Sequence, residues 1–152
     1  MTTPLPPPLA VQTLDTNVMV RVLVGDDPVQ TPLAEEAFLG AIQAGGAFIP
    51  DVVLAEVAWV LRGYGLDRAT RHNLLQRLIR TRGVVVVDVD AVIDALGRFQ
   101  QGGDFADQLV LARAASHGAM PVLTFDQGFA KNKGVKLIGP LSSGPAADPA
   151  TP

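Results

Sequence analysis

The chain has 152 residues, of which 48% are hydrophobic and 18% are charged, with a formal net charge of −3. This composition predicts a soluble, globular single domain, and no apolar run approaches the roughly 20 residues of a membrane-spanning helix. The N-terminus lacks the features of a signal peptide, and the chain has no cysteine, so we expect a cytoplasmic protein without disulfides or thiolate metal sites.

Strands and helices alternate along the first half of the chain. Residues 1–10 contain four prolines and are expected to form a flexible lead-in. The patterns that follow predict strands at residues 11–15 and 47–49, and helices at residues 17–24, 31–44, 50–61 and 67–80. Thr31 and Pro32 are the expected start of the second helix. The third helix is apolar nearly all round, which predicts burial on every side.

The second half continues this alternation. The β-branched run at residues 84–87 predicts a parallel strand covered on both faces. Helices at residues 88–99 and 104–118, strands at 121–124 and 135–138, and a tail at 139–152 that is expected to be disordered complete the pattern. The alternation predicts an α/β fold, specifically a three-layer α/β/α sandwich with a mainly parallel central sheet, in one domain spanning residues 11–138.

Acidic residues follow two of the predicted strands. Asp15 comes after the first strand and Asp126 after the strand at 121–124. Ligands bind at the carboxyl ends of strands in open α/β sheets, which makes both residues candidates for a functional site. Either residue alone is more often a turn or capping residue, because aspartate favours such positions.

Three further acids lie on predicted helices. Glu56 has mainly apolar neighbours, so it needs a partner or a proton unless it is simply exposed on a half-buried helix. Asp104 and Asp107 are three residues apart and share one helix face, although Asp104 alone fits an N-cap. If all five acids meet at one sheet edge, their repulsion calls for raised pKa values or a divalent cation among them.

The kinds of side chain available limit which ion and which substrate fit such a site. His72 and His117 are far apart and lack ligand spacing, so zinc is not expected, and carboxylate oxygens favour Mg²⁺ or Mn²⁺. Residues 62–82 contain six arginines and one acid, a formal charge of +5. This segment is either a solvated helix face or a surface that attracts a phosphodiester.

Three segments together resemble a known family: LDTNVMVRVLVGDDP, VLAEVAWVLRGYGLDR and DFADQLVLARAASHGAMPVLTFDQGF. They resemble PIN-domain ribonucleases, in particular the VapC toxins of type II toxin–antitoxin systems, over about residues 12 to 138. The resemblance implies a Mg²⁺- or Mn²⁺-dependent endoribonuclease that cuts structured RNA such as tRNA or ribosomal RNA. It also implies a homodimer and inhibition by a cognate VapB-like antitoxin that lies across the toxin groove.

The resemblance also implies roles for individual residues. The family's acidic quartet and a frequent extra acid correspond to Asp15, Glu56, Asp107, Asp126 and Asp104, respectively. Of these, Asp15, Glu56 and Asp107 are the expected metal ligands, with Asp104 and Asp126 assisting. Thr16 and Asn17 match the polar pair that holds Asp15 or a water.

Two other functions remain open at this point. One is a non-catalytic, PIN-like RNA-binding protein. The other is a phosphotransfer enzyme that uses Asp15 as its nucleophile. Such enzymes usually need a second aspartate two residues further on, where this chain has Asn17.

Overall fold

The computed structural model describes residues 9–139. The helices of this part are α1 (Thr16–Val24), α2 (Gln30–Ala44), α3 (Asp51–Gly63), α4 (Arg68–Ile79), α5 (Val89–Gln100), α6 (Phe105–Ser116) and the short 3-10 helix η1 (Phe129–Lys131). The strands are β1 (Ala10–Thr13), β2 (Gly45–Phe48), β3 (Val84–Val85), β4 (Val122–Thr124) and β5 (Val135–Leu137). This order confirms the predicted alternation. The expected lead-in and tail lie outside the described residues, except for positions 9, 10 and 139.

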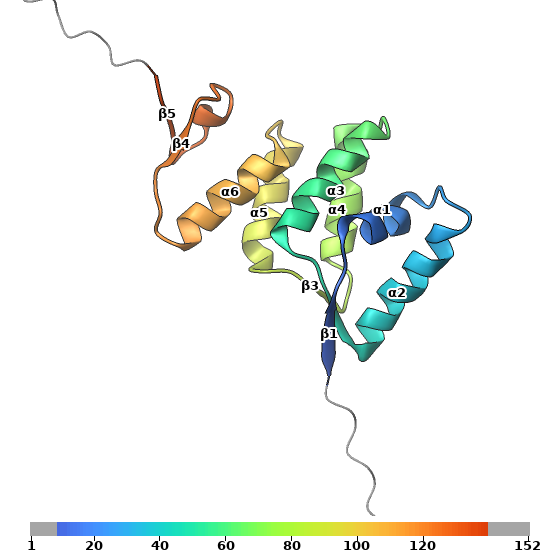
Figure 1. The fold of residues 1–152 in the computed structure, drawn as a ribbon. Coiled ribbons are helices and arrows are strands. Elements are labelled where there is room, and N and C mark those ends of the chain that lie inside the picture. The colour runs from blue at the N-terminus through green and yellow to red at the C-terminus, as the bar shows by residue number, and fades with distance from the viewer. Residues whose placement is uncertain (1–8, 140–152) are drawn as a thin grey trace, which may run out of the picture.

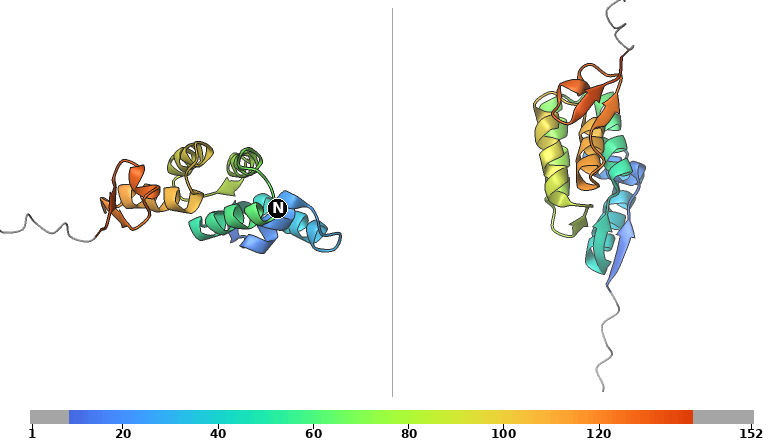
Figure 2. Two further views of the ribbon diagram at one scale, coloured as in Figure 1. Left: turned by 90° about the horizontal axis from the view of Figure 1, so that it is seen from above. Right: turned by 90° about the vertical axis from the view of Figure 1, so that its left-hand side faces the viewer.

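All the described strand pairs are parallel, which confirms the predicted α/β class. The strands nevertheless form two sheets: one has the order β1–β2–β3, and the other pairs β4 with β5. Figures 1 and 2 show α6 lying between the β4–β5 pair and β1. The second sheet pairs strands that are close in sequence, and closing a short loop costs little entropy. Within residues 9–139, one edge of β1 and one edge of β4 therefore have no strand partner.

The helices lie in two rows when the molecule is seen from above, with α4 and α5 in one row and α1, α2, α3 and α6 in the other (Figure 2). The core between them includes five fully buried side chains from successive parts of the chain: Met19, Ile49, Leu54, Leu75 and Leu96. Burying such a side chain contributes roughly 1.5–3 kcal/mol. No helix in the described part of the chain is long and apolar enough to cross a membrane.

Side-chain caps fix where several helices begin. Asp67 accepts a hydrogen bond from the Thr70 N–H at 2.7 Å and so caps α4, the helix expected to begin at this residue. The predicted cap of α2 was wrong. Asp27 accepts from the Gln30 N–H at 2.7 Å, and the Thr31 hydroxyl oxygen accepts from the Asp27 N–H at 3.3 Å. The N-cap position is Val29, which provides no side-chain cap, and the first N–H of α2 is instead bonded by Asp27 of the preceding turn.

Two burial predictions also need correction. The run at residues 84–87 forms only a two-residue strand at the edge of the first sheet, and Val85 and Val87 are 39% and 49% exposed. Because no described strand pairs beyond β3, one flank of this run faces solvent. Helix α3 is not buried all round: Val52 and Trp59 are 63% and 75% exposed. Its exposed side is one face of the helix, and the opposite face packs into the core.

A bidentate ion pair joins two helices that are distant in sequence. The Arg113 guanidinium on α6 donates to both carboxylate oxygens of Asp51, at 2.5 and 2.9 Å, and to the Val87 carbonyl at 2.5 Å. Charge-assisted bonds of this paired geometry are stronger than neutral ones. Accordingly, the Asp51 hydrogen bond raises the pKa of Arg113. The contact holds α6 against the start of α3, which determines where the acids of α6 lie.

Candidate active site

The first predicted site segment is the turn from β1 into α1. Leu14 is buried and continues the strand pairing, with its N–H donating to the Phe48 carbonyl at 3.1 Å. Asp15 then caps α1 by accepting from the Val18 N–H at 3.0 Å. One of its carboxylate oxygens is thus engaged by the helix, and the side chain is exposed. The buried strand end holds the carboxylate at the protein surface, where a ligand can reach it.

Asn17 lies close to Asp15 on the same helix start. Both residues line a cavity of about 310 Å³ between α1 and α2, together with Arg21 and Gln30. Arg21 forms an ion pair with Asp26 at 3.0 Å and donates to Gln30 at 2.9 Å. The Asn17 amide is exposed, as expected for a group that meets a ligand or water rather than the core.

Glu56 is connected to this turn through a hydroxyl group. The Thr16 Oγ1 donates to Glu56 Oε2 at 2.8 Å, across 40 residues of sequence. Of the two situations the sequence left open for Glu56, the structure shows the exposed one, on the solvent face of α3. The Thr16 contact orients one carboxylate oxygen, so Asp15, Thr16 and Glu56 form one group that joins α1 to α3.

The remaining three acids form a second group at the start of α6. Asp104 caps this helix by accepting from the Asp107 N–H at 3.1 Å. Asp126 accepts from the Phe129 N–H at 2.9 Å, which fixes the turn after β4. Asp104, Asp107 and Asp126 line a cavity of about 410 Å³, with Lys131 and Asn132 at its border.

Electrostatic coupling shows that this second group is close enough to interact. Burial raises the pKa of Asp107, and the negative charges of Asp104 and Asp126 raise it further. Three carboxylates that share a cavity repel one another, and a cation bound among them relieves that repulsion. The all-oxygen donor set also suits a hard divalent ion such as Mg²⁺ or Mn²⁺.

The structure does not bring the five acids together at one point. Among residues 9–139, no group of three or more acidic, histidine or cysteine side chains is placed to hold a metal ion. Asp126 follows a strand of the second sheet, whereas Asp15 follows a strand of the first. The strand ends therefore do not meet at one sheet edge, which was the premise of the sequence argument. Roles for these acids in metal binding and catalysis remain predictions.

The raised pKa of Asp107 predicts a pH-dependent gain in stability for Asp107→Asn. A carboxyl with a raised pKa in the folded state stabilises the fold only while protonated, and this contribution is lost as pH rises from its ordinary pKa of 3.8 through the folded value. We expect metal-free Asp107→Asn to be more stable than wild type at pH 7, by less than about 1 kcal/mol because solvent screens the repulsion. The difference between the two proteins should shrink at pH 3.

Urea unfolding in EDTA at the two pH values measures this effect. Glu36→Gln is the matched control, because Glu36 is an exposed acid on α2 and lies outside both acidic groups. Equal pH dependence in the two variants would show that the fold does not raise the pKa of Asp107. Added Mg²⁺ should raise the free energy of unfolding of wild type more than that of Asp107→Asn. The bound ion offsets a negative charge that the amide of the variant no longer carries.

Some residues near the site were not singled out in the sequence. Asp51 and Arg113 are 62 residues apart, and nothing local indicates that they pair. Trp59 lies on the helix that was expected to be buried on every side, yet it is exposed. Arg68 and Arg71 belonged to the basic segment, and their i, i+3 spacing is the signal that indicates a shared helix face.

Comparison with known proteins gives one match. The PIN domain family matches residues 13–135, which cover most of the chain and contain all seven candidate site residues. No characterised protein and no solved structure showed a significant match. The PIN domain is generally a nuclease fold, and its members usually use divalent metal ions. The chain belongs to the PIN domain family.

Proposed function

We propose that this protein is a divalent-metal-dependent endoribonuclease and acts as the VapC-type toxin of a type II toxin–antitoxin pair. The observation that carries the proposal is the acidic group at the start of α6, within a chain matched to the PIN family. Burial raises the pKa of Asp107, and the charges of Asp104 and Asp126 raise it further, so a cation bound nearby would relieve this strain. Structured RNA, such as tRNA or ribosomal RNA, is the proposed substrate.

The ion, Mg²⁺ or Mn²⁺, would be held by Asp107 together with Asp15 and Glu56, and Asp104 and Asp126 would assist. When bound, it would supply positive charge that orients the phosphate and offsets the negative charge developing on the phosphoryl oxygens. Among residues 9–139, no three of these acids are placed to hold an ion, and Asp15 lines a different cavity from the acids near α6. The proposal therefore requires these acids to approach one another when ion and RNA bind.

The chain's own residues supply the other parts of the reaction. The Val18 N–H holds one oxygen of Asp15, and the Thr16 hydroxyl holds one oxygen of Glu56, so each carboxylate has a second oxygen available for a ligand. A carboxylate that accepts a proton from water makes that water a better nucleophile. The water oxygen attacks phosphorus, the bond to the 3′ oxygen breaks, and a proton goes to that oxygen. The products are a 5′-phosphate and a 3′-hydroxyl.

Protein partners are also part of the proposal. Apolar side chains that are more than half exposed lie along α3, α6 and the β4 region: Val52, Val110, Leu123 and Phe125. A second copy of the chain or a VapB-like antitoxin would cover such side chains, because large exposed apolar patches usually mark interfaces. A neighbouring gene for a small protein that binds this chain would support the toxin role.

Incubation of the purified protein with tRNA and ribosomal RNA tests the activity directly. We expect cleavage in Mg²⁺ or Mn²⁺, none in EDTA, and full recovery when the metal is restored. Sequencing the new ends should show 5′-phosphates at defined sites. Binding of RNA without cleavage in Mn²⁺ would favour the non-catalytic alternative. A covalent aspartyl-phosphate on Asp15 would favour the phosphotransfer enzyme.

A further inference from the structure

Another polar cavity, next to the acidic group at the start of α6, is lined largely by arginines. It has a volume of about 300 Å³ and lies between α3, α4 and the turn from α5 into α6. The lining residues that matter here are Trp59, Arg62, Arg68, Arg71, Phe99 and Asp104. The charged side chains of this lining are three arginines and one aspartate, so the cavity is cationic in a protein whose net charge is −3.

Two of the three arginines, Arg68 and Arg71, are held in place by uncharged groups. Arg68 donates to the carbonyls of Phe99 and Gly103, at 2.7 and 2.6 Å, which are uncharged acceptors. The guanidinium groups of Arg68 and Arg71 lie over the Phe99 ring, at 4.9 and 5.3 Å from its centroid. Among residues 9–139, none of the three arginines forms an ion pair. Arg68 and Arg71 thus carry positive charge in fixed positions, and no ion pair offsets the free-energy cost of holding it there.

Arg71 has a hydrogen-bond donor that the described residues leave unsatisfied. Its Nε is buried and has no hydrogen-bond partner among the described residues. A buried donor without a partner costs about 1–3 kcal/mol, so such groups generally signal a missing ligand or water. Burial lowers the pKa of Arg71, and the charges of Arg68 and Arg62 lower it further. A bound anion would satisfy the donor and relieve the repulsion together.

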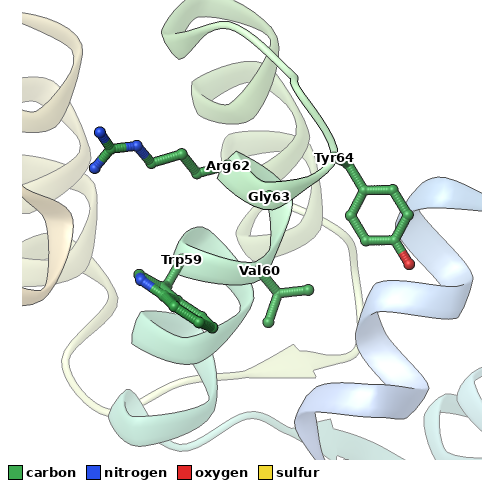
Figure 3. A pocket seen from close by; sticks show the side chains of 5 residues that line it. All are labelled: Trp59, Val60, Arg62, Gly63 and Tyr64. Atoms are coloured by element: carbon green, nitrogen blue, oxygen red, sulfur yellow. The ribbon is translucent and has the colours of Figure 1, made fainter.

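The surroundings of the cavity indicate which kind of anion fits. Trp59 lines this cavity and is 75% exposed. It also lines a neighbouring cavity of about 570 Å³, where Figure 3 shows Arg62 of α3 and Tyr64, in the turn after α3, pointing in opposite directions. Exposed aromatic rings beside arginines are the usual platform for single-stranded nucleic acids, because every base can stack on them. An acidic peptide has no base to place against the indole.

Position links this cavity to the acidic group. Asp104 lines both the arginine cavity and the cavity that contains Asp107 and Asp126. A strand whose phosphate lies among the arginines therefore passes next to the carboxylates. Guanidinium groups suit this task because their planar fork of donors matches phosphate oxygens.

We propose that Arg62, Arg68 and Arg71 bind a backbone phosphate of single-stranded RNA beside the cleavage site, with Trp59 stacking on an adjacent base. This inference rests on the proposed function for its choice of RNA, and it adds that the cut lies in an unpaired segment. It names a recognition site whose binding does not depend on the metal.

Fluorescence anisotropy with a labelled single-stranded RNA of roughly 12 nucleotides, measured in EDTA, tests the proposal. We expect Arg71→Gln to weaken binding about tenfold and to reduce the slope of log affinity against log salt by about 0.7, the value for one lost phosphate contact. Trp59→Ala should weaken binding about tenfold with no change in that slope. Arg77→Gln, an exposed arginine of α4 outside the cavity, is the matched control and should change affinity less than twofold.

Arg62→Gln serves as a second variant, because Arg62 is exposed and its replacement leaves the packing around Arg71 intact. Equal losses for Arg71→Gln, Arg62→Gln and Arg77→Gln would overturn the proposal in favour of diffuse charge attraction. A labelled polyglutamate that binds more tightly than RNA, with the same sensitivity to Arg71→Gln, would show a protein-docking surface instead. Because EDTA prevents cleavage, a failure here is separate from a failure of the nuclease assay.

Discussion

Asp15→Asn is expected to lower metal-dependent RNA cleavage at least about 100-fold while leaving the fold intact. A loss of this size corresponds to roughly 2.7 kcal/mol of transition-state stabilisation. The amide removes the negative charge but keeps an oxygen that can accept from the Val18 N–H, so α1 retains its cap. The variant therefore tests the negative charge of Asp15 in cleavage without removing its structural role as a cap. Initial cleavage rates in Mg²⁺ measure the effect, and circular dichroism checks the fold.

Asp88→Asn provides the matched control for this variant. Asp88 is also an exposed N-cap, accepting from the Ala91 N–H at 3.3 Å at the start of α5. It belongs to neither acidic group, so the same chemical change there should alter the cleavage rate less than twofold. Full activity in Asp15→Asn would remove Asp15 from the mechanism. An equal loss in both variants would point to helix capping as the cause.

Gly45→Ala is expected to destabilise the fold by about 2–4 kcal/mol, the range for overpacking combined with backbone strain. Gly45 ends α2 and begins β2 with φ 152°, a conformation that other residues rarely adopt. A Cβ there would lie 2.8 Å from the Ala10 backbone nitrogen and 3.0 Å from its oxygen. These atoms belong to the paired strand β1, which cannot move away without losing its register. The midpoint of urea unfolding measures the loss.

Gly40→Ala, five residues earlier and inside α2, is the control for this prediction. A Cβ at Gly40 would meet nothing within 4 Å. Alanine has the higher helix propensity, so this variant should be more stable than wild type by about 0.5–1 kcal/mol. Similar stability changes in the two variants would mean that the contact with β1 does not limit the residue at position 45.

Local patterns in the sequence were enough to predict most of the secondary structure. Asp67 and Asp104 begin helices as expected, because a capping side chain needs only the next three residues. The i, i+3 spacing of Asp104 and Asp107 likewise placed both acids at one helix start. In each case, the interaction is complete within one turn of the chain.

Long-range relations could not be predicted in the same way. The division into two sheets depends on which strand edges meet, and the alternation of strands and helices is compatible with either one or two sheets. The contact between Thr16 and Glu56 and the pairing of Arg113 with Asp51 depend on helix packing. The number of arginines between residues 62 and 82 can be read from the sequence, but not that the Arg71 Nε has no hydrogen-bond partner among residues 9–139. Contacts within one helix turn were thus more predictable than contacts between elements that are distant in sequence.

Within residues 9–139, one edge of β1 and one edge of β4 have no strand partner, and these edges bear on contacts with other chains. Each edge presents backbone N–H and C=O groups beside an exposed apolar side chain, Val11 at 55% and Leu123 at 59%. Backbone groups of this kind can accept an incoming strand of any sequence that lies flat against them. Strand addition at either edge would join two molecules without any change in the core, so it would become more frequent as the protein concentration rises.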